Sequence, residues 1–563
     1  MRYGQHFSVR RVTQDQPIPG EKQVQNNDGA YVYAVDDWAR LDRFLVLGSE
    51  GGSYYATERA LTRENAAAVQ RCIEADGPRT VARTAEISDT ARAPKNDPAI
   101  FVLAMCLKLG NVETRKAAAA AVTTVCRTGT HLFQFAAAVN ELGGWGRVTR
   151  WAVSNWYMSR SAGALARQVV KYRQRVIQEG HPETRWSHMD LLRLAHGTKG
   201  ADPERAGVLR WAARGDVKPV SIPRTLGPRV LGQKPTATRT DEYTAVPQHP
   251  YIAAYEALQA TTDPREAARM IREHNFPREA VPTPLLGKVE IWDALLTAGK
   301  GMPMTAMIRN LGVMTANGLL TPMSEAERFV CARLRDAQAL KEDRVHPFGI
   351  LLAQSIYRTG HGLRGDKTWA PSSPVLDALN DAFYLAFGSI EPTGKRHLIA
   401  LDVSGSMRTS IIAGSFLSAR EGSAVMAMAT AKVEPVHHFM AFSGGFIPLD
   451  ISPRDRLDTT LRKISSLPFN HTNCALPMLY ALEHKIPVDV FIVYTDSETN
   501  AHGTVQPVVA LRQYRQKTGI PAKLVVVGMV SNGFSLADPQ DGGMLDVVGM
   551  DAAAPRVISD FVR

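Results

Sequence analysis

From residue 395 to the end of the chain, short apolar segments alternate with segments of helical periodicity. The predicted strands cover 396–403, 436–442, 488–495 and 523–529, and the predicted helices cover about 411–431, 456–466, 475–484 and 505–517. Strands that alternate with helices in this way form a mostly parallel sheet covered by helices. No other feature constrains the fold as strongly, and it predicts an α/β domain over residues 391–563.

Residues from about 35 to 390 show a different pattern, with apolar residues three and four positions apart and no alternating strands. The clearest helical segments are 117–125, 164–176, 253–258 and 329–340. At 563 residues, the chain is too long for a single core. Short helices with frequent breaks and no fixed sequence period favour an α-solenoid of the HEAT type. We therefore expect a multidomain protein in which an all-α array over 29–390 precedes the α/β domain.

Two segments lack the periodicity of a folded element. Residues 1–28 are polar, contain two prolines and are predicted to form a flexible tail. Residues 215–250 carry a proline every few positions, with basic residues between the prolines. Proline at this density forbids a helix. This second segment is therefore predicted to be an extended basic loop, with a disordered linker as the alternative.

Positive charge is concentrated in one stretch of the chain. The formal net charge is +11. Residues 147–239 hold 18 Lys and Arg against 6 Asp and Glu, whereas residues 395–563 hold 16 against 15. A solvated surface usually mixes the two signs, and a one-sided stretch of this length more often contacts phosphates. The charge distribution therefore favours nucleic-acid binding by the helical region over a merely basic surface.

The candidate RNA contacts lie inside this basic stretch. They are Lys171, Tyr172, Arg173, Arg175, Arg185 and His188. Lys171 and Arg175 are four residues apart, so on a helix they share a face and can contact two phosphates. Tyr172, Trp186 and His188 offer rings for stacking on unpaired bases, which suits RNA ends and loops better than duplex DNA. Core packing is the alternative role for Tyr172 and Trp186.

A group of oxygen-bearing side chains is predicted at one edge of the sheet. Asp402, Ser404 and Ser406 follow the first strand two residues apart, Thr472 lies in a later loop, and Asp496 ends another buried strand. Both aspartates fall at strand carboxyl ends, where open α/β sheets bind ligands. Carboxylate and hydroxyl oxygens are ligands of hard cations, so we expect a divalent cation here, with Mg²⁺ as the expected ion. The alternative is a tight loop in which Asp402 only caps the next helix.

The sequence places no His or Cys as a nucleophile or base beside these oxygens. His471, next to Thr472, is the best candidate for a proton shuttle, but such a residue is more often a plain loop histidine. We therefore expect a binding protein and not an enzyme. Two alternatives stay open: a metal-dependent phosphodiesterase acting on RNA at Asp402 and Asp496, and an adhesion module whose metal captures an acidic side chain of a protein partner.

Composition also bears on the compartment. No run of about 18 apolar residues is present, so we expect no transmembrane helix and no membrane partner. The N-terminus lacks the apolar core of a secretory signal, which predicts a cytoplasmic protein. The 5 cysteines are scattered and form no CxxC pair. They are expected to be reduced core residues and not a disulfide framework or a zinc site.

Several long segments carry a resemblance to a known family. They are RFLVLGSEGGSYY at 43–55, VCRTGTHLF at 125–133, WSHMDLLR at 186–193, LGVMTAN at 311–317, TGHGLRG at 359–365, PTGKR at 392–396 and SNGFSLADP at 531–539. With these segments the chain resembles, from about Gly29 to the C-terminus, the Ro autoantigen family. Members of that family are RNA-binding proteins built from a TROVE module and a von Willebrand factor A domain. The high Ala and Arg content is typical of a bacterial relative.

The resemblance carries expectations of its own. It implies a HEAT-repeat ring closed by the A domain, with small noncoding Y RNA on the basic outer surface. It also implies that a central hole takes single-stranded 3′ ends of misfolded noncoding RNA. Bacterial relatives work with the exoribonuclease polynucleotide phosphorylase, so the implied role is a scaffold in noncoding RNA quality control and decay.

Site residues also follow from the resemblance. The family's RNA-binding positions match Lys171, Arg175 and His188, and its metal ligands match Asp402, Ser404, Ser406, Thr472 and Asp496. The metal loop departs from the family pattern. Asn470, His471 and Asn473 stand where relatives have two glycines and an aspartate around the loop threonine.

Overall fold

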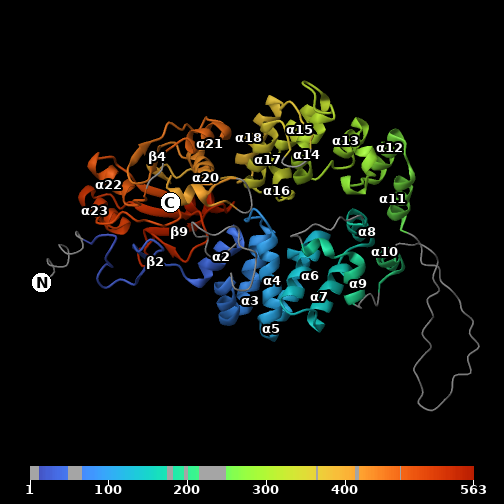
Figure 1. Cartoon of the computed structure of the whole chain (residues 1–563), viewed down its shortest axis with the longest axis horizontal. Helices are drawn as coiled ribbons and strands as arrows, with labels where there is room; N and C mark the ends of the chain where they lie inside the picture. Colours follow the sequence, from blue (N-terminus) through green and yellow to red (C-terminus); the bar gives the residue numbers. More distant parts are fainter. Residues whose placement is uncertain are drawn as a thin grey trace, which may run out of the picture. The chain divides into compact units, whose positions relative to one another are not determined.

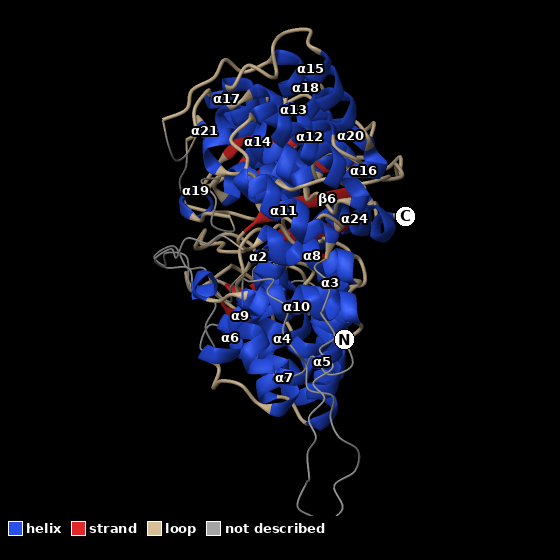
Figure 2. Cartoon of the chain, turned by 90° about the vertical axis from the view of Figure 1, so that its right-hand side faces the viewer, coloured by secondary structure: helices blue, strands red, loops and turns tan. Residues whose placement is uncertain are grey.

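The fold was analysed in a computed structural model of the chain (Figure 1). The structure describes residues 12–48, 66–173, 182–195, 201–214, 249–362, 366–412, 417–468 and 471–563. Within these residues a helical region precedes an α/β domain, as the sequence predicts, and helices predominate outside that domain (Figure 2). None of the described helices combines the length and apolar composition needed to cross a bilayer.

By compactness the chain divides into two units, residues 103–302 and residues 1–102 with 303–563. The division falls inside the predicted helical domain of 29–390. One reason is that α2 (Asp37–Leu47) packs against the last strand of the α/β domain. The first helices of the helical region therefore belong to the same unit as the C-terminal domain.

The described part of the unit of residues 103–302 is helical. Its elements are α4 (Asp97–Leu109), which begins before the division, α5 (Val112–Val125), α6 (Gly129–Glu141), α7 (Arg147–Met158), α8 (Ala162–Lys171), η2 (Pro182–Arg185), α9 (His188–Ala195), α10 (Pro203–Arg214), α11 (Pro250–Ala260), α12 (Pro264–His274), η3 (Arg278–Ala280), η4 (Thr283–Gly287) and α13 (Val289–Thr297). Helices pack in pairs, such as α5 on α7, α7 on α9 and α12 on α13. Most of the predicted basic loop of 215–250 lies outside the described residues.

The helices of the other unit that lie outside the α/β domain come from two parts of the sequence, one before and one after the unit of residues 103–302. They are α2, α3 (Ala67–Asp89), α14 (Met304–Ala316), α15 (Glu325–Leu334), α16 (Ala337–Glu342), α17 (Pro347–Thr359) and α18 (Ser373–Leu385). The single helix predicted over 329–340 is in fact α15 and α16. The chain breaks between them because the Asp336 carboxylate accepts a hydrogen bond from Ala339 N at 3.0 Å and so starts a new helix.

The α/β domain is built on a six-stranded sheet. Its strands are β3 (His397–Asp402), β4 (His437–Phe442), β5 (Phe446–Pro448), β6 (Val490–Thr495), β7 (Lys523–Gly528) and β9 (Met544–Val548), and its helices are α19 (Gly405–Thr409), α20 (Ala419–Val433), α21 (Leu457–Ser465), α22 (Leu476–Glu483), α23 (Pro507–Thr518) and α24 (Ala554–Val562). The spatial order is β5-β4-β3-β6-β7-β9. All neighbours are parallel except β5, which runs antiparallel to β4.

Both faces of this sheet are buried. Leu398 and Ala400 of β3 belong to a core that includes Met478 of α22 and Tyr514 of α23. The alternate strand residues point to the opposite face, where α20 packs against β3 and β6. Continuous apolar strands of this kind are typical of parallel sheets covered by helices. All 5 cysteines are buried, and no disulfide joins any two of them.

The central pair of strands creates the place where a ligand can bind. After β3 the chain crosses to β4 on one side, and after β6 it crosses to β7 on the other side. The loops that leave β3 and β6 therefore separate from each other, which is the switch point at which open α/β sheets bind ligands. Asp402 and Asp496 lie at this point.

The N-terminal segment differs from the predicted tail. Residues 12–34 form β1 (Gln23–Gln25) and β2 (Tyr31–Ala34), and β2 pairs antiparallel with β8 (Phe534–Ser535). Val12, Ile18 and Val32 are buried in the core of the α/β domain. The prediction of a flexible tail is therefore wrong for residues 12–28. Their few apolar side chains are too widely spaced to show a periodic pattern. In the folded chain, these side chains pack against the apolar core of the α/β domain.

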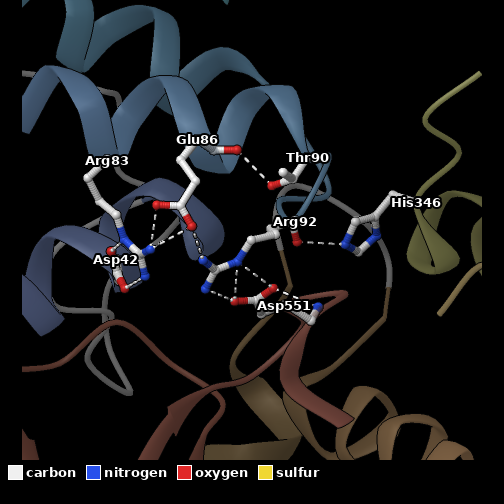
Figure 3. Close-up of polar contacts among 8 residues, drawn as sticks. Asp42, Arg83, Glu86, Thr90, Arg92, His346 and Asp551 are labelled. Carbon is white, nitrogen blue, oxygen red and sulfur yellow. Dashed lines mark hydrogen bonds and ion pairs between the residues drawn. The ribbon is translucent and has the colours of Figure 1, made fainter. Parts of the chain in front are cut away.

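Arginines join α2 to α3, and they join α2 and the segment after α3 to the α/β domain (Figure 3). Arg92 Nη2 lies 2.6 Å from Asp551 Oδ2, and Arg83 Nη2 lies 2.5 Å from Asp42 Oδ2. Arg43 is fully buried in α2, and its Nη2 lies 2.8 Å from Asp546 of β9. These contacts explain why both ends of the chain belong to one compact unit.

Candidate nucleic-acid interface and candidate metal centre

Three of the predicted RNA contacts lie at the C-terminal end of α8. Lys171 is the last residue of the helix, and Tyr172 and Arg173 follow it. Lys171 and Tyr172 are half-buried, whereas Arg173 is exposed. Lys171 Nζ lies 5.6 Å from the centre of the Tyr172 ring. Arg175 lies outside the described residues.

Tyr172 packs against residues of α6. Its ring meets Phe133 edge-on with centroids 5.9 Å apart. The packing depends on Gly129, because a Cβ at that position would lie 2.5 Å from Tyr172 Cδ2. Tyr172 therefore combines core packing with partial exposure, two roles that the sequence analysis treated as alternatives.

His188 is a core residue beside Tyr172. Only 4% of it is exposed, and its Nδ1 lies 2.8 Å from the Tyr157 hydroxyl. The Phe133 ring lies 4.9 Å from its own ring and the Tyr172 ring 6.2 Å away. The prediction that His188 stacks directly on a base does not fit this burial, because protein rings surround it. The histidine instead supports the position of Tyr172.

Arg185 and Trp186 lie on the segment that leads into α9. η2 packs against α6, the helix that carries Phe133, and it presents Arg185 to solvent. Trp186 is half-buried, with its ring 5.7 Å from that of Trp145. The packing alternative for Trp186 therefore agrees with the structure.

The surroundings of Lys171 have an excess of positive charge. Among the described residues, no carboxylate forms an ion pair with Lys171, Arg173 or Arg185, whereas other cations of this unit, such as Arg205, are paired. Burial, together with the charges of Arg127 and Lys171, lowers the pKa of His131 to about 4. The potential that repels a proton here would attract a phosphate. Arg127 and His131 were missed as contributors, although both lie in the VCRTGTHLF segment.

The second candidate site begins where β3 ends. Asp402 is fully buried; its Oδ1 accepts a hydrogen bond from Ser404 N at 2.9 Å, and its Oδ2 accepts one from Thr495 Oγ1 at 2.7 Å. The hydroxyl oxygens of Ser404 and Ser406 lie 3.1 Å apart. Thr495 was not predicted, although its place before Asp496 at the end of β6 was a usable signal.

Asp496 and Thr472 complete the predicted set. The Ser406 side chain lies near Asp496 and lowers the pKa of that carboxyl, against the larger opposite effect of burial. Thr472 is buried, and its backbone N donates to Asn500 Oδ1 at 2.6 Å. Hydrogen bonds therefore link Asp402 to Ser404 and Ser404 to Ser406, and they tie Thr472 to the loop that follows Asp496.

The electrostatics of this site fit a cation. Burial, together with the charge of Asp496, raises the pKa of Asp402 to about 7. Burial also raises the pKa of Asp496. A divalent ion would offset both effects, and it would find oxygen ligands of the kind that Mg²⁺ prefers. In the part of the chain that the structure describes, no three His, Cys, Asp or Glu side chains form a metal cluster, so hydroxyl oxygens would have to supply further ligands.

Models of known protein families match the helical region and the α/β domain separately. A model of the TROVE domain matches residues 24–216 and 245–373, and a model of the Ro60 vWA domain matches residues 396–562. Together these matches span most of the sequence. The chain belongs to the Ro60 family.

Individual Ro60 relatives cover nearly the whole chain. One is "RNA-binding protein RO60" of Deinococcus radiodurans, which is 42% identical over 96% of this chain and 96% of its own length. Another is "RNA-binding protein RO60" of Caenorhabditis elegans, which is 34% identical over 98% of this chain and 92% of its own. The solved structure of the Deinococcus radiodurans RO (RSR) protein matches with a TM-score of 0.65 and 39% identity, covering 94% of this chain and 99% of that chain.

The two candidate sites of this chain lie in different domains of the Ro60 family. Lys171, Tyr172 and Arg173 lie in the part matched by the TROVE model, and Asp402 and Asp496 lie in the part matched by the Ro60 vWA model. The resemblance read from seven short segments is thus confirmed at the level of the family.

Proposed function

We propose that this chain binds RNA through the basic surface at the end of α8. The observation that carries the proposal is the set of exposed or half-exposed cations, Lys171, Arg173 and Arg185, which no described carboxylate neutralises. Tyr172 lies beside them as a partly exposed ring. Cations next to an aromatic ring can hold a phosphate backbone and stack an unpaired base. The names of the relatives, which are RNA-binding proteins, support this choice of ligand.

The RNA class follows from the family resemblance. We propose small noncoding RNA of the Y-like type as one ligand and single-stranded 3′ ends of misfolded noncoding RNA as another. The chain would then act as a scaffold in RNA quality control and decay, with an exoribonuclease such as polynucleotide phosphorylase as a partner. Relatives named as binding proteins favour a protein that is not an enzyme.

Removing two of the cations tests the RNA surface. We expect Lys171→Gln with Arg173→Gln to weaken binding of a Y-like RNA at least tenfold. The slope of log affinity against log salt should fall by about 1.5, because each lost phosphate contact removes about 0.7–0.9. Fluorescence anisotropy titrations at several salt concentrations measure both quantities.

A matched control removes the same charge elsewhere in the unit. Arg269 and Arg272 of α12 are exposed but already paired, with Glu273 at 2.9 Å and Asp293 at 2.7 Å. The variant Arg269→Gln with Arg272→Gln should keep wild-type affinity and slope. Equal losses in both double variants would contradict a specific surface at the end of α8.

We also propose a divalent cation, Mg²⁺ in the first instance, at Asp402, Ser404, Ser406, Thr472 and Asp496. The support is the pair of buried carboxylates that lack a cationic side chain as partner among the described residues. When bound, the ion would supply a coordination position for an acidic group of a protein partner. His471 is exposed and packs on Gly444, where a Cβ would lie 2.5 Å from its ring, so nothing marks it as a catalytic base.

A further inference from the structure

Helix α7 carries an exposed tryptophan that the proposed RNA surface does not use. Trp151 is 54% exposed, whereas the other tryptophans of the chain are buried or half-buried. The opposite side of α7 is the packed side, with Ala152, Val153 and Trp156 buried. Trp151 therefore does not anchor the helix, and an exposed indole of this size is unusual in a surface without a ligand.

Two arginines flank this indole. Arg147 is four residues before Trp151, so one helical turn separates them on the same side, and Arg150 directly precedes it. Both arginines are exposed, and no described side chain forms an ion pair with either. The helix itself contains no Asp or Glu. The patch of Arg147, Arg150 and Trp151 thus presents a ring together with two cations that no described side chain neutralises.

Local stability does not explain this arrangement. Arg147 and Arg150 lie in the first turn or so of α7, where the helix dipole disfavours positive charge. The helix start has no side-chain cap, since Gly146 precedes it. An exposed indole loses the free energy that burial would provide. Each of the three side chains is therefore energetically unfavourable at its position unless an anionic ligand with an apolar face covers the patch.

We propose that the Arg147–Arg150–Trp151 patch is a second RNA subsite, in which an unpaired base stacks on Trp151 while the arginines contact the adjoining phosphates. Single-stranded RNA is the ligand that offers both groups in alternation, since every base has a stacking face and every linkage carries a charge. An acidic protein would satisfy the arginines but would leave the indole without a planar partner. The inference rests on the proposed RNA binding and assigns residues of α7 to the recognition of an unpaired base.

The patch is connected to the first RNA surface through α7 itself. Tyr157, near the other end of the helix, holds His188 through the 2.8 Å contact, and His188 packs beside Tyr172. At 1.5 Å per residue, Trp151 and Tyr157 are about 9 Å apart along the helix axis. The two surfaces are thus connected by one helix, with Trp151 on its exposed side and Tyr157 on its packed side.

Two RNAs and two substitutions test the proposal. The RNAs are one hairpin with a blunt end and the same hairpin with a single-stranded 3′ tail. We expect Trp151→Ala to weaken binding of the tailed RNA about 5- to 100-fold, the range reported by alanine substitution of stacking rings. Binding of the blunt hairpin should change less than twofold. Trp151→Phe keeps a ring and should recover most of the affinity for the tailed RNA.

The control is Val112→Ala on α5, which removes another exposed apolar side chain, 66% exposed, from the same unit. It should leave both affinities unchanged, and thermal unfolding should show that all variants fold. Unchanged affinity of Trp151→Ala for the tailed RNA overturns the subsite, and so does an equal loss for both RNAs. If the wild-type protein binds neither RNA, or if Lys171→Gln with Arg173→Gln has no effect, the proposed function itself fails.

Discussion

At the scale of single residues, burial decides what a histidine does. His188 was expected to meet RNA, but the structure surrounds it with Tyr157, Tyr172 and Phe133. His346 is also buried; its Nδ1 accepts a hydrogen bond from Phe348 N at 3.1 Å and so caps α17. Its Nε2 then carries the proton and donates to Arg92 O at 3.0 Å (Figure 3).

The buried position of His346 makes stability depend on pH. Burial lowers its pKa to about 4, despite the nearby charge of Asp551, which acts in the opposite direction. The unfolded chain takes up a proton near pH 6.5, which the folded chain resists. The free energy of unfolding should therefore fall as pH drops from about 6.5 towards 4, by at most about 1.4 kcal/mol per pH unit from this group.

The variant His346→Asn keeps a side-chain acceptor for the helix cap but cannot titrate. Urea unfolding at pH 7, 6 and 5 should show a shallower pH dependence in this variant than in the wild type. Identical slopes would mean that His346 does not stay neutral in the folded protein.

At the scale of elements, the N-terminal segment supports the loops of the candidate metal centre. Gln14 is fully buried; its Nε2 donates to Asn473 Oδ1 at 3.1 Å, and its Oε1 accepts from Thr499 Oγ1 at 2.8 Å. One amide therefore fixes the residue after Thr472 to the loop after Asp496. Sequence periodicity does not reveal this contact, because a polar residue in a polar segment has no periodic signature.

The cation proposal predicts that Mg²⁺ stabilises the unit that contains the sheet. At a concentration 100 times its Kd, bound Mg²⁺ should raise the free energy of unfolding by about 2.7 kcal/mol. Asp402→Asn should abolish this effect, and Gln14→Ala should reduce it with Asp402 intact. Asp450→Asn is the control, because that side chain is fully exposed on the same domain. Thermal unfolding with and without Mg²⁺ measures the effect, and no shift in the wild type would count against the site.

At the scale of the whole molecule, buried arginines connect segments that are far apart in the sequence. Arg43 Nη1 donates to Asn532 O at 2.9 Å and to Phe534 O at 3.0 Å, while Nη2 pairs with Asp546. Arg43 was noted only as the start of the family segment 43–55. Its tertiary role is to hold α2 against β8 and β9.

Loss of this arginine should be costly. Arg43→Met would leave Asp546 and two carbonyl oxygens without their donor, and breaking a buried pair typically costs about 3–5 kcal/mol. Arg71→Met is the control, since Arg71 of α3 pairs with Asp37 of α2, the helix that carries Arg43, in a partly exposed position and should cost less than about 1 kcal/mol. Urea unfolding compares the two, and similar losses would contradict the assigned role of Arg43.

Prediction from sequence succeeded for features that depend on a local motif or on an apolar pattern repeated over many residues. The four predicted strands of the α/β domain agree with β3, β4, β6 and β7 within two residues. Strands β5, β8 and β9 were missed, because short edge strands have too few residues for a pattern to appear. The two aspartates were placed together correctly, since parallel topology brings strand carboxyl ends to one edge.

The amino-acid sequence by itself determined the order of helical region and α/β domain, the concentration of charge in 147–239, and the meeting of Asp402 with Asp496. Each depends on periodicity, composition or topology, which act along the chain. Only the tertiary structure decided that His188 is buried, that Trp151 is exposed and that residues 12–34 join the sheet domain. Burial depends on which distant surfaces meet, and a contact such as Arg43 with Asp546 becomes favourable only after both surfaces have excluded water.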